Sequence, residues 1–111
     1  MARTKKYFNY EIPKGIVEIV KAVCADYIRR DRALRWDELN DGVRFEYLRL
    51  NGAIEGALGI IDTSSRLDMI GDIAQGRGYE FSPCSPFLAK NTYYQRKRQI
   101  VHDIAVNLGL L

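Results

Sequence analysis

The stretch NTYYQRKRQIVHDIAVNLGLL, residues 91–111, predicts a long helix with one apolar side. Its apolar residues recur with a period of about 3.6 residues, so one face of the helix is expected to be buried. That face consists of Tyr94, Val101, Ile104, Ala105 and Leu108. Asn91 or Thr92 has a side chain suited to cap the start of the helix, and Gly109 is placed to end it. We interpret this stretch as a helix anchored in a small helical core.

The first half of this predicted helix is basic. Arg96, Lys97 and Arg98 follow one another there, and Asp103 is the only acidic residue of the stretch. The partial positive charge at a helix N-terminus disfavours cations nearby by roughly a few tenths of a kcal/mol each. A bound polyanion would compensate this repulsion, whereas a merely solvated basic face would need no ligand. Of these two interpretations, the first predicts a helix that faces nucleic acid.

Length and composition indicate a single helical domain over residues 1–111. Apolar residues make up 47% of the sequence and charged residues 28%, which is ordinary for a soluble globular protein. The sequence has no apolar run long enough to span a membrane, and its first ten residues contain no apolar secretory segment. We therefore expect a cytoplasmic protein without a membrane partner.

Charge is distributed unevenly along the chain. Residues 1–30 carry a net charge of +4, residues 31–76 carry −4, and residues 77–111 carry +3. If the two basic ends meet in the fold, they form one positive surface with an acidic back, as in small DNA-binding proteins.

Residues 1–10 form a basic N-terminal arm in which cations alternate with aromatic residues. Arg3, Lys5 and Lys6 stand beside Tyr7 and Phe8. Such an arm can lie along phosphates or in a minor groove, and it can equally be an untethered terminus without a specific partner.

Three further apolar patterns predict helices before residue 76. The first begins near Pro13 and ends between residues 29 and 35, the second covers residues 43–61, and the third follows a cluster of capping residues at 62–65. Gly76 and Gly78 are placed to end the third helix. Residues 78–84 are expected to be loop-like, with a short extended segment as an alternative. The predicted fold is thus an all-α bundle of about four helices.

Two alternatives remain open for residues 85–111. Ser85 and Pro86 offer a cap followed by a proline at the first helical position, so residues 85–89 can form a separate turn before the basic helix. Phe87, Tyr94 and Val101 are seven residues apart, which fits one unbroken helix instead. Only the broken alternative gives an element that resembles a helix-turn-helix, which makes residues 85–111 the expected DNA-binding element.

The sequence indicates neither an enzyme nor a cofactor-binding protein. Cys24 and Cys84 belong to no CxxC pair, and His102 is the only histidine, so zinc-ligand spacing is absent and no metal is expected. His102 precedes Asp103, but neighbouring positions on a helix are not expected to face each other as an acid–base pair. The glycines match no phosphate-binding or cofactor motif.

Two segments resemble the RinA/ArpU-type phage transcriptional regulators. Residues 12–27, from Ile-Pro-Lys-Gly to Ala-Asp-Tyr, are similar to the family's early helix. Residues 90–111, from Lys-Asn-Thr-Tyr-Tyr-Gln-Arg-Lys-Arg to Leu-Gly-Leu-Leu, are similar to its closing basic helix. The resemblance implies a helix-turn-helix related to a sigma-factor region, control of phage or prophage genes in a bacterial host cell, and RNA polymerase as a further partner. About fifteen residues separate the third predicted helix from the basic one, whereas a helix-turn-helix joins its helices by about three or four.

Sequence reasoning thus predicts a sequence-specific protein that binds double-stranded DNA and regulates transcription. Predicted contacts to base edges are Asn91, Tyr93, Gln95 and Arg96, because these side chains would project from the start of a helix in the major groove. Predicted contacts to phosphates are Lys90, Lys97, Arg98, Arg3, Lys5 and Lys6. Tyr94 is assigned to the core, and Tyr93 is left open between the core and the DNA. The alternative function is a helical protein–protein interaction module without DNA binding, and a homodimer is expected if an apolar face remains uncovered.

Overall fold

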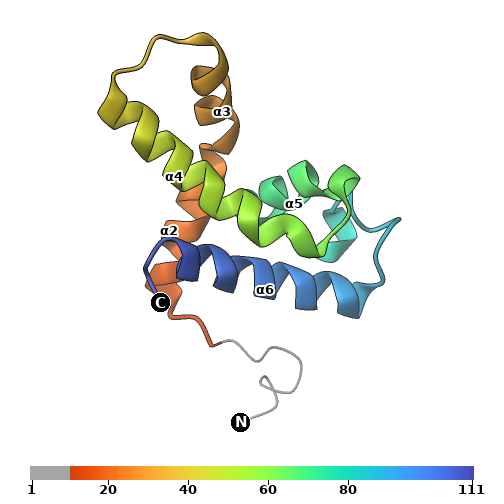
Figure 1. Cartoon of the computed structure of the whole chain (residues 1–111). Coiled ribbons are helices and arrows are strands. Elements are labelled where there is room, and N and C mark those ends of the chain that lie inside the picture. Colours follow the sequence, from red (N-terminus) through yellow and green to blue (C-terminus); the bar gives the residue numbers. More distant parts are fainter. Residues whose placement is uncertain (1–10) are drawn as a thin grey trace.

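The computed structural model describes residues 11–111, which form helices and connecting turns without a β-strand (Figure 1). The α-helices are α2 (Lys14–Ala25), α3 (Tyr27–Trp36), α4 (Asp41–Ala57), α5 (Thr63–Gln75) and α6 (Lys90–Asn107). Two short 3-10 helices, η1 (Leu58–Ile60) and η2 (Tyr79–Phe81), follow α4 and α5. The predicted all-α class is confirmed. None of the helices in this part of the chain has the length and apolar character needed to span a bilayer.

The first predicted helix is interrupted at Asp26, which separates α2 from α3. Asp26 has φ −102° and ψ 8°, so the helical ladder is broken there. The carbonyl oxygen of Val23 accepts hydrogen bonds from the N–H of Asp26 at 3.3 Å and from Nη2 of Arg30 at 2.5 Å. The side chain of Arg30 therefore satisfies a backbone group at the break, and the chain continues as a helix to Trp36.

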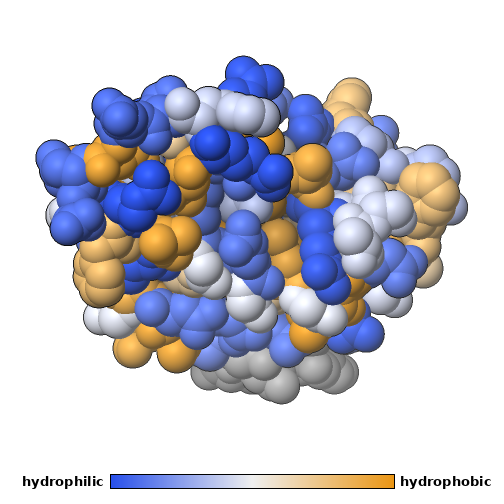
Figure 2. Space-filling view, turned by 45° about the horizontal axis from the view of Figure 1, so that its top comes forward, coloured by the Kyte–Doolittle hydropathy of each residue, from blue (hydrophilic) through white to orange (hydrophobic). Residues whose placement is uncertain are grey.

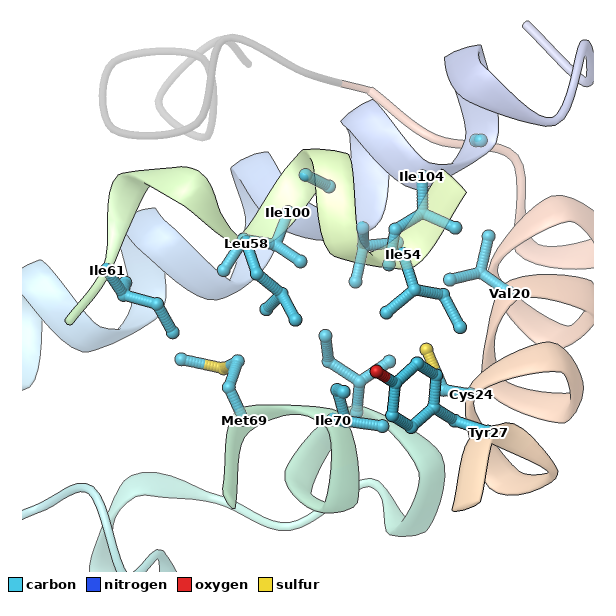
Figure 3. Packing of buried hydrophobic residues seen from close by; sticks show 14 of the residues in the cluster. Val20, Cys24, Tyr27, Ile54, Leu58, Ile61, Met69, Ile70, Ile100 and Ile104 are labelled. Carbon is cyan, nitrogen blue, oxygen red and sulfur yellow. The ribbon is translucent and has the colours of Figure 1, made fainter. Parts of the chain in front are cut away.

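The core lies where α2, α4, α5 and α6 meet (Figure 3). Helix α2 packs mainly against α5, and α4 packs mainly against α6. Their buried side chains converge on one cluster, which includes Val20, Cys24, Tyr27, Ile54, Leu58, Met69, Ile70, Ile100 and Ile104. Burial of the thiol raises the pKa of Cys24 to about 12. Both cysteines are buried and free, so they pack as small apolar residues.

The buried face of helix α6 differs slightly from the predicted one. Its fully buried residues are Tyr93, Ile100, Val101, Ile104 and Ala105, whereas Tyr94 and Leu108 are only partly buried. Predicted capping by Asn91 or Thr92 is wrong, because the helix already begins at Lys90 after Ala89 and has no side-chain cap. The predicted end at Gly109 is confirmed: Gly109 has φ 79°, and the backbone N–H of Leu110 donates to the carbonyl oxygen of Ala105 at 2.8 Å.

The connection between α5 and α6 contains neither a strand nor an α-helix. Residues 79–81 form the 3-10 helix η2 in place of an extended segment. Residues 84–88 form a single turn, in which the N–H groups of Phe87 and Leu88 donate to the carbonyl of Cys84 at 2.9 and 3.1 Å. The broken alternative is therefore correct, but residues 85–89 do not supply the first helix of a helix-turn-helix. Tyr79 holds the turn, because its hydroxyl lies 3.0 Å from the carbonyl oxygen of Ser85 and 2.8 Å from that of Leu88.

Helix α3 and the first half of α4 form a hairpin that projects from the rest of the molecule (Figure 1). The described part of the chain is accordingly elongated, with extents of 47 × 30 × 20 Å. Two buried contacts hold the hairpin at its base. Nε of Arg30 donates to Oδ1 of Asn51 at 2.7 Å, and Nδ2 of Asn51 donates to the carbonyl of Tyr27 at 3.3 Å. The two helices are thus joined by polar side chains where the apolar core ends.

Candidate nucleic-acid interface

Within the described residues, α2 from the N-terminal part of the chain packs against α6 from the C-terminal part. Lys21 of α2 lies near Gly76, which ends α5. A Cβ atom added to Gly76 would lie 3.4 Å from Nζ of Lys21. Arg77 follows that end directly, and Lys97 of α6 contacts the backbone of Arg77. The cation cluster of Lys21, Arg77 and Lys97 is therefore assembled from three separate segments. Arg3, Lys5 and Lys6, predicted as phosphate contacts, lie outside the described residues.

Lys97 occupies the centre of the cation cluster. Its Nζ donates to the carbonyl oxygen of Arg77 at 2.5 Å and lies 5.6 Å from the centre of the Tyr93 ring. Burial lowers the pKa of Lys97; the carboxylate of Asp72 opposes this effect, and the charges of Lys21 and Arg77 add to it. An anion bound beside Lys97 would relieve the repulsion among the three cations.

A buried polar network lies beneath the cation cluster and fixes its position. Asp72 of α5 is completely buried and accepts hydrogen bonds from Oγ of Ser82, from the hydroxyl of Tyr93 at 2.9 Å and from Nε of Arg77 at 2.6 Å. The network joins α5, the connection and α6. Its three donors compensate the burial of the carboxylate, and Arg77 is held on the side of Lys97.

Tyr93 belongs to this network, and its prediction as a base contact is wrong. The side chain is completely buried, and burial together with the hydrogen bond to Asp72 raises its pKa. Edge-to-face contacts with the rings of Tyr79 and Tyr94, with centroids 5.4 and 5.1 Å away, complete the packing. Tyr93 is thus a core tyrosine. Tyr94 packs against the core from its edge, as predicted, and its hydroxyl accepts a hydrogen bond from the N–H of Tyr79 at 3.0 Å.

The outward side of α6 carries a polar stripe. Asn91, Gln95, Arg98 and His102 are spaced by four, three and four residues, so they follow one another along one helix face. Asn91 and Gln95 are exposed, and Arg98 is partly buried. Predicted base contacts Asn91 and Gln95 therefore lie together. Arg96 does not join them, because each helical residue is rotated by about 100° from the one before.

The predicted phosphate contacts of α6 do not all lie together. Lys97 and Arg98 both line a groove of about 290 Å³ between α2 and α6, together with Ile12 and Val17, and Lys97 also reaches the cation cluster. Lys90 is exposed at the start of the helix, where it forms an ion pair with Glu80 at 3.1 Å. The three consecutive cations of residues 96–98 consequently do not form one patch; the patch includes Lys21 and Arg77, which the sequence did not single out.

His102 and Asp103 lie closer together than predicted. Nδ1 of His102 is 3.1 Å from Oδ1 of Asp103, so these neighbours interact even though they occupy consecutive helical positions. Both side chains are partly exposed on α6. Within residues 11–111, no three of the His, Cys, Asp and Glu side chains are grouped so that they could hold a metal ion.

Comparison of the sequence and structure with protein families, curated proteins and solved structures gives no match.

Proposed function

We propose that this chain binds double-stranded DNA through α6 and the cation cluster, as a sequence-specific regulator of transcription. The observation that carries the proposal is the convergence of Lys21, Arg77 and Lys97 from three segments beside one outward-facing helix. The fold gathers these three cations around one buried acid, Asp72, which pairs with Arg77 and offsets only part of the positive charge. A phosphate backbone is the partner that turns the remaining repulsion into binding energy.

Helix α6 has the dimensions and side chains that major-groove recognition needs. Eighteen residues correspond to a length of about 27 Å, and a major groove about 12 Å wide admits an α-helix. Asn91 and Gln95 would read adenine edges, since their amides can donate and accept together, and Arg98 would read guanine or bind a phosphate. Helix α6 would act as a recognition helix without a helix-turn-helix partner, held instead by α2, α4 and the buried network.

The proposal is tested by replacing two cations at this interface and, as a control, two cations of α3 and α4. The double variant Lys21→Ala with Arg98→Ala is expected to bind a labelled duplex roughly tenfold more weakly or worse, because two phosphate contacts are lost. The matched control, Arg32→Ala with Arg44→Ala, removes the same charge from α3 and α4 and is expected to bind like the unmodified chain. Fluorescence anisotropy at low salt measures both affinities. An equal loss in the two variants would mean that net charge alone, and not this face, attracts DNA.

A second candidate function is a helical protein–protein interaction module. Large apolar side chains are exposed on the hairpin, with Trp36 80% and Phe45 69% accessible. Such exposure favours a protein partner. This candidate would be favoured over the first if the chain bound no duplex at low salt and its hairpin bound a protein.

A further inference from the structure

The groove of about 290 Å³ between α2 and α6 combines apolar walls with two cations. We name it the α2–α6 groove; its lining consists of Ile12, Val17, Tyr94, Lys97, Arg98 and Val101. The walls are fixed in place by the core, because Val101 belongs to it and Val17 and Tyr94 pack against it. The hydroxyl of Tyr94 is also held by the N–H of Tyr79. The α2–α6 groove is therefore a preformed site.

The charges of the α2–α6 groove have one sign, which distinguishes it from other hollows of the surface. Apolar and hydrophilic side chains are interspersed on the face shown in Figure 2. Two other grooves also contain acids: Asp31 and Glu55 line the one between the hairpin and α5, and Asp37 lines the one beside Trp36. Among the residues that the structure describes, the lining of the α2–α6 groove has two cations and no acid. It is therefore complementary to an anion.

Lys97 keeps donors and positive charge for such an anion. Its ammonium has three N–H donors, and one of them donates to the carbonyl oxygen of Arg77, which is an uncharged acceptor. The carboxylate of Asp72 also acts on Lys97, but it already forms an ion pair with Arg77 at 2.6 Å. The charges of Lys21 and Arg77 add to the effect of burial in lowering the pKa of Lys97. A second anion beside Lys97 would oppose these effects.

The apolar walls determine what must carry the anionic group. Ligand pockets typically have about 300–1,000 Å³, so a groove of this volume fits a small molecule. A phosphate ion or a DNA backbone has no apolar part to cover Ile12, Val17 and Val101. A neutral apolar molecule covers them but leaves the ammonium of Lys97 in a less polar place without a counter-charge. A small apolar molecule with one acidic group meets both requirements.

We propose that the α2–α6 groove binds a small carboxylic acid with an apolar body. The carboxylate accepts hydrogen bonds from Lys97 beside Arg98, and the apolar body lies against Ile12, Val17 and Val101. The bound acid places a negative charge next to two cations that the proposed function assigns to DNA, so it weakens duplex binding and acts as an effector. This regulatory part rests on the proposed function, whereas the binding of the acid does not.

The first test uses octanoate as the probe and follows the backbone amide signals of the full chain by NMR. Octanoate is expected to shift signals of α2 and α6, with a dissociation constant on the order of 0.1–1 mM. Acetate, which lacks the apolar body, and octanol, which lacks the charge, are expected to bind roughly tenfold more weakly or worse. No binding of octanoate, or equal binding of octanol or acetate, would overturn the proposal.

The second test places substitutions in the groove and next to it. Val17→Asp opposes the carboxylate of the ligand, and Lys97→Met removes the charge but keeps an unbranched apolar stem. Each is expected to weaken octanoate binding about tenfold or more. The matched controls are Ile19→Asp and Lys14→Met, because both residues are exposed on α2 and neither lines the groove. They are expected to bind octanoate like the unmodified chain.

Circular dichroism verifies that these four variants are folded. Octanoate affinity that is unchanged in a folded Val17→Asp or Lys97→Met chain would overturn the proposal. Equal losses in the groove variants and their controls would do the same, because they would place the bound octanoate outside the α2–α6 groove.

The regulatory part is tested by measuring duplex affinity in saturating octanoate and in the same concentration of acetate. Octanoate is expected to weaken duplex binding about tenfold relative to acetate, because it opposes two phosphate contacts. Unchanged duplex affinity with octanoate bound would contradict the regulatory part. A chain that binds octanoate but no duplex would support the acid site and contradict the DNA-binding function alone.

Discussion

Replacing Asp72 with alanine is expected to lower the free energy of unfolding by about 3–5 kcal/mol, measured by urea denaturation. The carboxylate is completely buried and accepts hydrogen bonds from Ser82, Tyr93 and Arg77. Its removal leaves the buried hydroxyl of Ser82 without an acceptor and the hydroxyl of Tyr93 with only the more distant carbonyl oxygen of Arg77, at 3.3 Å. The partly buried guanidinium of Arg77 also loses its counter-ion. Each unsatisfied buried group destabilises the fold by about 1–3 kcal/mol, so the loss greatly exceeds that of an ordinary surface substitution.

Asp68 provides the matched control, because it lies one turn earlier on α5 and is partly exposed. Asp68→Ala is expected to leave the midpoint of unfolding almost unchanged. Tyr93→Phe should fall between the two, since it removes one donor and keeps the ring in the core. If Asp72→Ala were as stable as Asp68→Ala, the network would not be what holds the connection between α5 and α6.

Replacing Arg30 with alanine is expected to lower the free energy of unfolding by about 3 kcal/mol. Arg30 is 3% exposed and binds the carbonyl of Val23 and the side chain of Asn51. Alanine leaves the buried Oδ1 of Asn51 without a donor and the carbonyl oxygen of Val23 with only the N–H of Asp26 at 3.3 Å. It also removes the aliphatic part of the side chain from the base of the hairpin.

Replacement of the neighbouring Arg29 is the control for the loss of one positive charge. Its exposed side chain forms an ion pair with Asp26 at 2.5 Å, and its guanidinium carbon lies 5.4 Å from the centre of the Tyr47 ring. Arg29→Ala is expected to change the unfolding curve little, because exposed ion pairs are screened by solvent. Equal effects of the two substitutions would show that charge, and not the buried contacts, determines stability here.

The helices could be predicted because apolar spacing records which side of a helix is buried. The period from Ile16 to Tyr27 and the period of residues 43–61 both correspond to core faces in the structure. At the start of α6 the pattern was ambiguous, since Tyr93 and Tyr94 are both aromatic and differ by about 100° in direction. Only the distant partner, Asp72, determines which of the two enters the core.

Sequence signals for helix starts gave wrong predictions where tertiary contacts determine the local structure. Asn91 is a good capping residue, yet α6 already begins at Lys90, just after a turn held by Tyr79. Ser85 and Pro86 are typical of a helix start, yet the carbonyls of Ser85 and Leu88 are bound by the same tyrosine. Contacts of this kind join residues that are far from the pattern itself, so the sequence does not reveal them.

Only part of the candidate interface could be predicted. Sequence reasoning identified Lys97, Arg98, Asn91 and Gln95 because they form a basic, polar start of a helix. It missed Lys21 and Arg77, which reach the same place only through the packing of α2 on α5 and the network around Asp72. In the sequence, a buried charged residue such as Asp72 cannot be distinguished from a solvent-exposed position of an amphipathic helix, because its polar partners are distant in the chain.

The most direct measurement is the affinity of the unmodified chain for duplex DNA as a function of salt concentration. Four cations, Lys21, Arg77, Lys97 and Arg98, lie at the proposed interface. If each displaces a counterion, the logarithm of the association constant falls with the logarithm of salt concentration with a slope of about −3 to −4. A slope near zero, or no binding at about 50 mM salt with micromolar protein, would contradict the proposed DNA-binding function.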